Sequence, residues 1–214
     1  MTAEILRIHP EEPEPALVDL VAQSLDGGQV VALPTDTFYG LAVDPVNLAA
    51  VDRIYDIKDR ARHKPLSLLI ADTAQAYTLA RNCDTAFDRL AERFWPGPLT
   101  IIMQAGSRLP LRVTANTGNV ALRVPQAPIA RAVAAKLGIP ITATSANLNG
   151  RPECTSAESV FGQLGDQIPL IVDGGSTART VATTIVDLSR GGTKWSILRE
   201  GAIPTHEIAL CLQR

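Results

Sequence analysis

Short runs of apolar, often β-branched residues alternate along this chain with longer segments whose apolar residues recur every three or four positions. In the first helical segment these are Leu17, Leu20, Val21 and Leu25, and the segment stops at two glycines before the apolar run 30–33. The recurrence of apolar residues in the segment 17–25 is that of a helix buried on one face. The continuous apolar run 30–33 is that of a short buried strand. Such alternation predicts an α/β fold in which helices cover a sheet.

The same pattern continues to the end of the chain and places the other elements. The runs 30–33 and 38–43 are separated by a short turn, which favours a hairpin and hence a mixed sheet. No linker divides the chain, so we expect an N-terminal segment at 1–15 and one domain at 16–214. Further helices are expected at 48–57, 74–79, 87–94 and 129–137, and further strands at 66–71, 99–103, 120–124, 141–143, 170–172, 184–186 and 196–198.

Charge and cysteine content narrow the class of protein. The net charge is -2 over 214 residues, whereas a general polyanion binder is usually clearly basic. Cys83, Cys154 and Cys211 are odd in number and far apart, which is typical of a reducing compartment. The N-terminus lacks a signal-peptide pattern, and no run of 18 apolar residues occurs. We therefore expect a cytoplasmic protein without membrane contact.

A cluster of cations follows the helix expected at 48–57. Lys58, Arg60, Arg62 and Lys64 lie within seven positions. Cations after a helix C-terminus interact favourably with the helix dipole, which is one explanation of the cluster. Cations this close also repel one another unless an anion neutralises them, and Arg and Lys both suit phosphate oxygens. The cluster therefore favours a phosphate or carboxylate site, with Lys58 and Arg60 expected to face solvent.

Three further polar sites lie at the ends of expected strands, where open α/β sheets bind ligands. The hydroxyls of the loop 34–37 suit either a small polar substrate or a local turn. In the loop 143–150, Ser145 and Asn147 suit phosphate oxygens or ribose. Arg123 sits within an apolar strand, where an unpaired charge is costly. It must meet Asp36, Asp44 or a ligand carboxylate, and we favour the ligand.

Several familiar catalytic patterns are absent from the sequence. It contains no P-loop, no Rossmann glycine spacing, no metal-ligand spacing among its three histidines and no nucleophile motif. A site in this chain is therefore expected to work by binding and positioning its substrates.

Taken in order, seven stretches resemble the YrdC-type threonylcarbamoyl-AMP synthase family. They are GGQVVALPTDTFYGLAVDP, IYDIKDRARHKPLSLLI, RFWPGPLTIIM, NVALRVPQAPIARAV, TATSANLNGRP, IVDGG and ILREGAI. The resemblance implies a twisted mixed sheet with covering helices that enclose a concave basic cavity. It implies synthesis of threonylcarbamoyl-AMP and pyrophosphate from L-threonine, bicarbonate and ATP, with Mg²⁺ accompanying ATP. A separate tRNA threonylcarbamoyl transferase complex is implied as the downstream partner.

The resemblance also assigns residues to roles, in three overlapping groups. Two departures from the family pattern are Ala61, where Pro is common, and Ala182, where an acidic residue is usual. The metal is expected to have no protein side-chain ligand. The catalytic group is Lys58, Arg60, Ser145 and Asn147; the threonine-binding group is Thr37, Arg123, Ala143 and Thr183; the nucleotide-binding group is Lys58, Arg60, Lys64, Asn119, Ser145, Asn147 and Arg199.

Two other functions remain open on sequence grounds. A double-stranded RNA or tRNA-binding module could use the same basic cavity, and weak RNA binding is compatible with synthesis. Overall acidity and the lack of aromatic stacking residues beside the cations count against that module. The other alternative is a paralogue that keeps the fold and converts different substrates.

Overall fold

The computed structural model describes residues 2–177, 181–191 and 194–213. Within these ranges the helices are α1 (Pro15–Asp26), α2 (Leu48–Ile57), α3 (Thr73–Leu79), α4 (Thr85–Phe94), α5 (Leu111–Thr114), α6 (Pro128–Leu137), α7 (Ala157–Leu164) and α8 (Thr205–Leu212). The strands are β1 (Glu4–Arg7), β2 (Val31–Leu33), β3 (Gly40–Ala42), β4 (Ser67–Leu69), β5 (Ala80–Arg81), β6 (Leu99–Ala105), β7 (Asn119–Arg123), β8 (Ile141–Ser145), β9 (Leu170–Asp173), β10 (Thr184–Asp187) and β11 (Ser196–Arg199).

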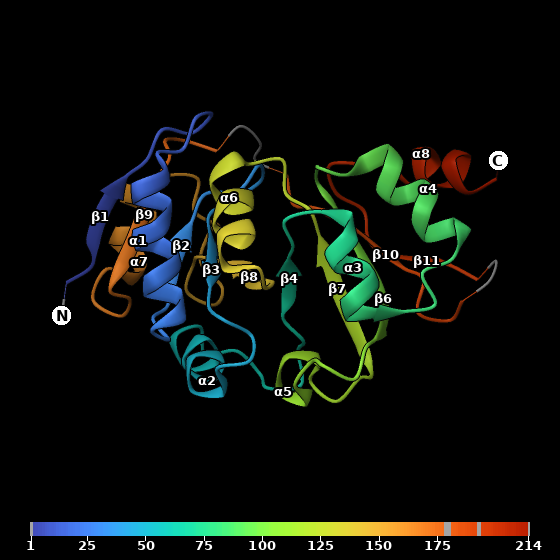
Figure 1. The fold of residues 1–214 in the computed structure, drawn as a ribbon, viewed down its shortest axis with the longest axis horizontal. Coiled ribbons are helices and arrows are strands. Elements are labelled where there is room, and N and C mark those ends of the chain that lie inside the picture. Colours follow the sequence, from blue (N-terminus) through green and yellow to red (C-terminus); the bar gives the residue numbers. More distant parts are fainter. Residues whose placement is uncertain (1, 178–180, 192–193, 214) are drawn as a thin grey trace.

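The described strands form one open mixed sheet. Its order is β1-β9-β2-β3-β8-β4-β7-β6-β10-β11, and β5 pairs with β6 at one side (Figure 1). β2 and β3 form the expected antiparallel hairpin. β8 is antiparallel to both of its neighbours, β3 and β4. The predicted α/β class, mixed sheet and covering helices are therefore confirmed.

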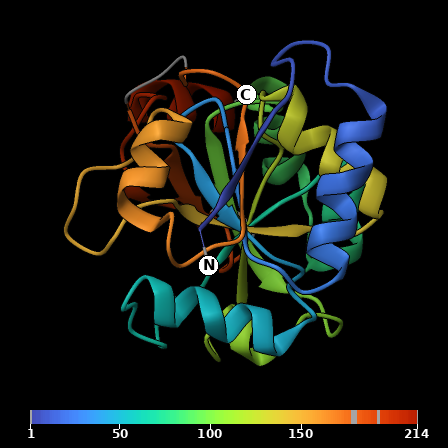
Figure 2. The ribbon, with the colours of Figure 1, turned by 90° about the vertical axis from the view of Figure 1, so that its left-hand side faces the viewer.

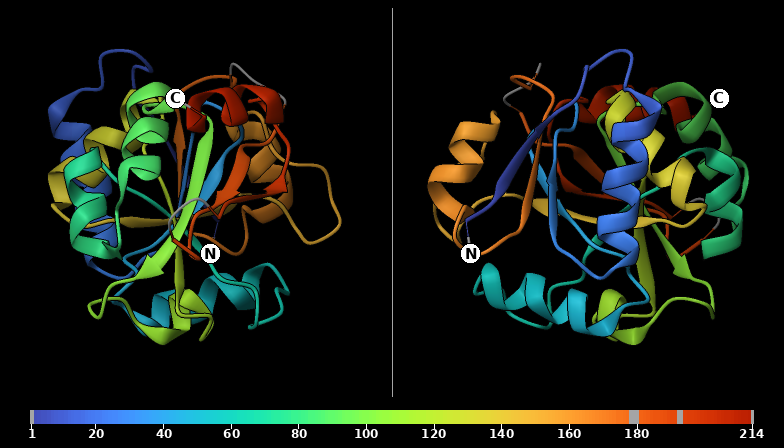
Figure 3. Two further views of the ribbon diagram at one scale, coloured as in Figure 1. Left: turned by 90° about the vertical axis from the view of Figure 1, so that its right-hand side faces the viewer. Right: turned by 60° about the vertical axis from the view of Figure 1, so that its left-hand side comes forward.

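Helices cover both faces of the sheet, as the expected periodicity requires. α1 and α6 pack together on one face, and α7 lies on the other (Figures 2 and 3). Alternate residues of β2 serve the two faces: Val31 and Leu33 pack with the α1 and α6 side chains, whereas Ala32 belongs to the larger core. This two-residue period is the reason that a fully apolar strand fits between two helical layers.

Helix ends are set by local chemistry that positions the site. The Asn47 side chain accepts a hydrogen bond from the Ala50 backbone N–H, which caps the start of α2. Lys58 is the residue at which α2 ends. The capped ends of α2 therefore set the position of the cation cluster, which begins at Lys58.

Five elements were not predicted from the sequence: β1, β5, α5, α7 and α8. β1 lies within the segment 1–15 and pairs in parallel with β9, so this segment contributes a strand to the sheet. β1 and β5 are too short to show a clear period, and α5 spans a single turn.

No helix in the described ranges is long and apolar enough to cross a membrane.

Candidate functional site

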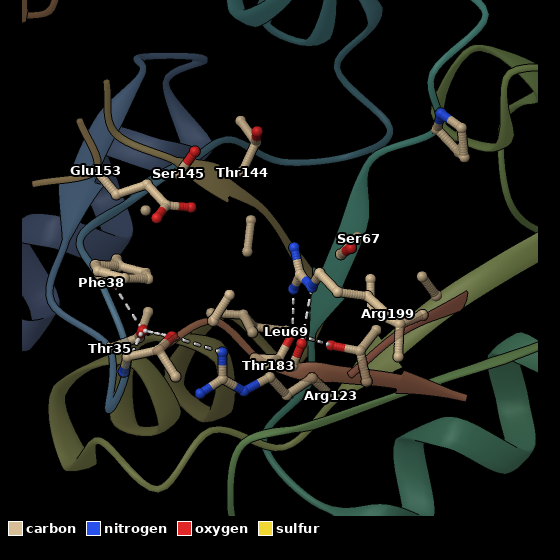
Figure 4. Close-up of a pocket in the computed structure, with 18 of the residues that line it drawn as sticks. Thr35, Phe38, Ser67, Leu69, Arg123, Thr144, Ser145, Glu153, Thr183 and Arg199 are labelled. Carbon is tan, nitrogen blue, oxygen red and sulfur yellow. Dashed lines mark hydrogen bonds between the residues drawn. The ribbon is translucent and has the colours of Figure 1, made fainter. Parts of the chain in front are cut away.

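A cavity of about 420 Å³ opens where the loop after β2 meets the strands on both sides of β8. Figure 4 labels lining side chains of the 35–38 loop and of β4, β7, β8 and β11, together with Glu153 and Thr183, which lie outside the strands. Among the described lining residues, Arg60, Lys64, Arg123 and Arg199 are basic and Glu153 is acidic. An excess of cations over anions in a concave space suits an anionic ligand.

Lys58 is buried behind this cavity, so the expectation that it faces solvent is wrong. Its residue is only 5% exposed. Its Nζ donates to the Ser145 and Asn147 backbone carbonyls and to Asn147 Oδ1, the last two at 2.7 and 3.1 Å. Burial, followed by the charge of Arg60, lowers the pKa of Lys58 to about 8. Lys58 therefore ties the end of α2 to the loop after β8.

Asn147 holds the same loop from within. Its Nδ2 donates to the carbonyls of Leu148 and Arg151 at 3.0 and 2.7 Å, while its Oδ1 receives Lys58. All of these partners are protein atoms, and Asn147 is buried and absent from the described cavity lining. Ser145, in contrast, lines the cavity. Lys58 and Asn147 thus shape the loop that presents Ser145.

The other cations of the cluster divide into two kinds. Arg60 donates to the carbonyls of Lys64 and Pro65, at 3.4 and 2.9 Å, and lines the cavity together with Lys64. Burial lowers the pKa of Arg60. Arg62 instead forms exposed ion pairs with Asp52 and Asp56 of α2. Protein carboxylates therefore neutralise Arg62, while Arg60 and Lys64 border the cavity.

Arg123 meets a protein carboxylate and also borders the cavity. Its Nη2 lies 2.5 Å from Asp36 Oδ1, and both side chains are 7% exposed. Its Nε donates to the Gly97 carbonyl and its Nη1 to Thr37 Oγ1, at 3.0 and 3.2 Å. The acidic partner that we ranked second is thus present, and Arg123 is held rigidly at the wall.

Two hydroxyl networks complete the walls. Thr35 Oγ1 donates to the Phe38 carbonyl at 2.7 Å and lies 3.1 Å from Thr37 Oγ1. Arg199 donates to the Thr183 carbonyl from Nε and to Thr183 Oγ1 from Nη2 (Figure 4). Thr100 Oγ1 also donates to Thr183 Oγ1, at 3.1 Å. Each network is anchored by an arginine of the lining.

Most of the expected site residues converge on this cavity. Lys58 and Asn147 lie behind it, and Asn119 starts β7 outside the described lining, whereas Arg123 ends that strand. Sequence analysis missed two lining residues, Thr100 and Glu153. Thr100 lies in the stretch RFWPGPLTIIM, and Glu153 directly follows the stretch TATSANLNGRP. The expected residues that line the cavity are Thr37, Arg60, Lys64, Arg123, Ala143, Ser145, Thr183 and Arg199.

The lining fits a magnesium ion that arrives with a nucleotide. Among the described residues, no group of three or more His, Cys, Asp or Glu side chains is placed to hold a metal. Glu153 is the single carboxylate of the described lining. Mg²⁺ is commonly bound by one or two carboxylates together with substrate phosphates. One lining carboxylate would suit a magnesium ion only if substrate phosphates supplied most of its other ligands.

Comparison with known proteins shows the family to which the chain belongs. The family model Sua5_yciO_yrdC, described as "Telomere recombination", matches residues 23–201. The chain belongs to the Sua5/YciO/YrdC family. The Sua5 structure from Pyrococcus abyssi complexed with L-threonine superposes with a TM-score of 0.91 at 34% identity, covering 98% of this chain and 61% of that one.

Curated members of the Sua5/YciO/YrdC family give the same relation. The protein named threonylcarbamoyl-AMP synthase from Pyrococcus abyssi is 37% identical over 89% of this chain and 56% of its own length. Its namesake from Bacillus subtilis is 41% identical over 87% of this chain and 54% of its own length. The chain thus spans about half the length of these two relatives.

Proposed function

We propose that this chain is an L-threonylcarbamoyladenylate synthase, a nucleotidyltransferase. It would form threonylcarbamoyl-AMP and pyrophosphate from L-threonine, bicarbonate and ATP, in the cytoplasm. The observation that carries the proposal is one cavity with two chemically different regions. Thr37, Arg123 and Thr183 offer hydroxyls and a cation of the kind that suits an amino acid, and Arg60 and Lys64 offer cations for phosphates. The names of the relatives and the threonine complex support this choice.

The proposed chemistry requires no protein nucleophile. The neutral threonine amine adds to the carbon of CO₂ and gives a carbamate with loss of one proton, or adds to bicarbonate and gives the same carbamate with loss of water. A carbamate oxygen then attacks the ATP α-phosphorus, and pyrophosphate leaves. Positioning and neutralisation of developing charge lower the barriers of both steps. Arg60, Lys64 and Arg199 would neutralise phosphate oxygens, and Ser145 would bond the nucleotide.

Lys58 and Asn147 act indirectly in this proposal. Lys58 holds the carbonyls of the loop after β8, and that loop carries Ser145. Mg²⁺ bound by the triphosphate would supply charge neutralisation of the phosphates, and Glu153 is the carboxylate of the described lining. Asn119 stays a predicted nucleotide contact. The tRNA threonylcarbamoyl transferase complex is the proposed acceptor of the product.

Pyrophosphate release with each substrate omitted in turn tests the function directly. Release that needs ATP, threonine and bicarbonate together is the expected result. ATP hydrolysis that ignores threonine would indicate a paralogue with another substrate. Binding of double-stranded RNA without any threonine-dependent turnover would favour the RNA-binding module.

Threonine and ATP are expected to stabilise the fold cooperatively, because each would complete a wall of the other's site. A ligand that binds the folded state raises the melting temperature through its occupancy. The combined shift should therefore exceed the sum of the two separate shifts. Differential scanning fluorimetry with threonine, with a non-hydrolysable ATP analogue and with both measures it. Shifts that merely add would contradict a shared cavity.

Replacing Arg60 by Ala is expected to reduce the rate of pyrophosphate release by about tenfold to a hundredfold. A charge-assisted hydrogen bond contributes about 1.5–3 kcal/mol, and more where charge develops during reaction. R62A is the matched control, since Arg62 is two positions away and paired with Asp52 and Asp56. Near-normal turnover in R60A, or an equal loss in R62A, would contradict the assignment of Arg60 to the phosphates.

A further inference from the structure

Thr183 is a hydrogen-bond donor toward the cavity, because its acceptor positions are already used. Arg199 Nη2 donates to Thr183 Oγ1 over 2.7 Å, and Thr100 Oγ1 donates to the same atom over 3.1 Å. A hydroxyl has one proton and two lone pairs. Both lone pairs therefore accept protein hydrogen bonds, and no acceptor among the described residues receives the Thr183 proton. That proton remains for a ligand.

Thr37 has the opposite polarity by the same reasoning. The Thr35 proton goes to the Phe38 carbonyl at 2.7 Å, since a carbonyl can only accept. The 3.1 Å contact between the two hydroxyls must then use the proton of Thr37. Thr37 Oγ1 also accepts from Arg123 Nη1. One lone pair of Thr37 is left, so Thr37 can only accept from a ligand.

Burial limits the ways in which either arrangement can rearrange. Thr100 is 3% exposed, and Thr37 and Thr183 are 4% and 7% exposed. In a site shielded from water, a hydroxyl that reverses its direction leaves a neighbouring donor or acceptor unsatisfied, which is costly. Thr183 and Thr37 both line the cavity, so their fixed polarities face the same ligand.

We propose that Thr183 is a fixed donor and Thr37 a fixed acceptor for the amino-acid substrate, with Thr100 and Thr35 as the positioning residues that set these polarities. The ligand must then present an acceptor, such as a carboxylate, carbonyl or hydroxyl oxygen, to Thr183. It must present a donor, such as an amine or hydroxyl, to Thr37. An amino acid supplies both groups. The choice of threonine as ligand rests on the proposed function, whereas the hydrogen-bond directions do not.

A double-mutant cycle on Thr100 and Thr183 tests the proposal. T100V removes the hydroxyl while keeping the shape, and T100S keeps the hydroxyl. T100V is expected to weaken threonine binding, measured by calorimetry, by roughly 3- to 10-fold, the worth of one hydrogen bond. T100S should remain within about twofold of wild type by the same measure. The T100V effect should appear in KM more than in kcat, and it should vanish in the T183V background.

Thermal stability without ligand supplies an independent test of the hydrogen bond between Thr100 and Thr183 on which the directions rest. T183V leaves the buried Thr100 proton without its acceptor, and T100V/T183V removes that orphaned donor. The double variant should therefore melt higher than T183V, by roughly 2–4 °C. A double variant that melts no higher overturns the Thr100–Thr183 hydrogen bond, and the assigned directions with it, whatever ligand the cavity takes.

The two hypotheses fail in different ways. If wild type binds threonine and T100V binds it equally well, the polarity proposal is overturned and the proposed function stands. If wild type shows neither threonine binding nor threonine-dependent pyrophosphate release, the proposed function is refuted. In that case the melting comparison still tests the Thr100–Thr183 hydrogen bond, whose absence would overturn the assigned directions.

Discussion

Replacing Asp36 by Asn is expected to lower the free energy of unfolding by about 3–5 kcal/mol, because it removes the carboxylate charge that pairs with the buried Arg123 guanidinium. Asp36 and Arg123 are each 7% exposed, and Asp36 Oδ1 also accepts from the Gln126 backbone N–H at 3.0 Å. Asn keeps the shape and an acceptor oxygen but not the charge. Chemical denaturation of both proteins, compared at equal m-value, measures the loss.

The matched control for this prediction is an exposed ion pair. Asp56 pairs with Arg62, and their side chains are 69% and 45% exposed. D56N should change the free energy of unfolding by no more than about 1 kcal/mol, the range of surface pairs. Similar losses for D36N and D56N would mean that burial of the Arg123 pair does not govern its contribution. In a second variant, D36N/R123M, removal of both charges should recover most of the loss.

The second large effect is expected in substrate choice. Turnover efficiency with threonine should exceed that with valine by roughly 10⁴-fold, because valine is nearly isosteric but leaves a polar group of the site unpaired. Thr37 and Thr183 are the buried hydroxyls that face the ligand. Serine keeps the hydroxyl and loses a methyl group, so it should be handicapped only by about 1–3 kcal/mol.

The measurement is the ratio of kcat/KM values for threonine, serine and valine under one set of conditions. The serine-to-valine ratio is the informative control, since it separates recognition of the hydroxyl from recognition of shape. Valine turning over faster than serine would show that the pocket reads shape, and would remove Thr37 and Thr183 from recognition of the substrate hydroxyl.

Much of the fold was predictable because its elements have clear periods. The hairpin of β2 and β3 and the helices α1 and α6 follow directly from apolar spacing and turn residues. β1 was not predictable, because four residues with mostly exposed side chains carry no strong pattern. Its identity as a strand depends on β9, far away in the sequence.

The site was predictable as a set of residues but less so in its geometry. Spacing placed Lys58 beside Arg60, yet only the folded chain shows that Lys58 turns inward to the loop after β8 while Arg60 borders the cavity. Thr100 reads in the sequence as an ordinary β-branched strand residue. Its significance lies in a hydrogen bond to Thr183, which belongs to another part of the chain.

The parallel pairing of β1 with β9 has a consequence for the order of events during synthesis on the ribosome. Glu4 pairs with Leu170 and Arg7 with Asp173, so β1 leaves the ribosome long before the strand that becomes its neighbour. β2 also pairs with β9 on its other edge. Contacts between residues so distant in sequence carry a large loop-closure cost and slow folding. The exposed edges of β1 and β2 must therefore stay apart from other nascent chains until translation has passed residue 173.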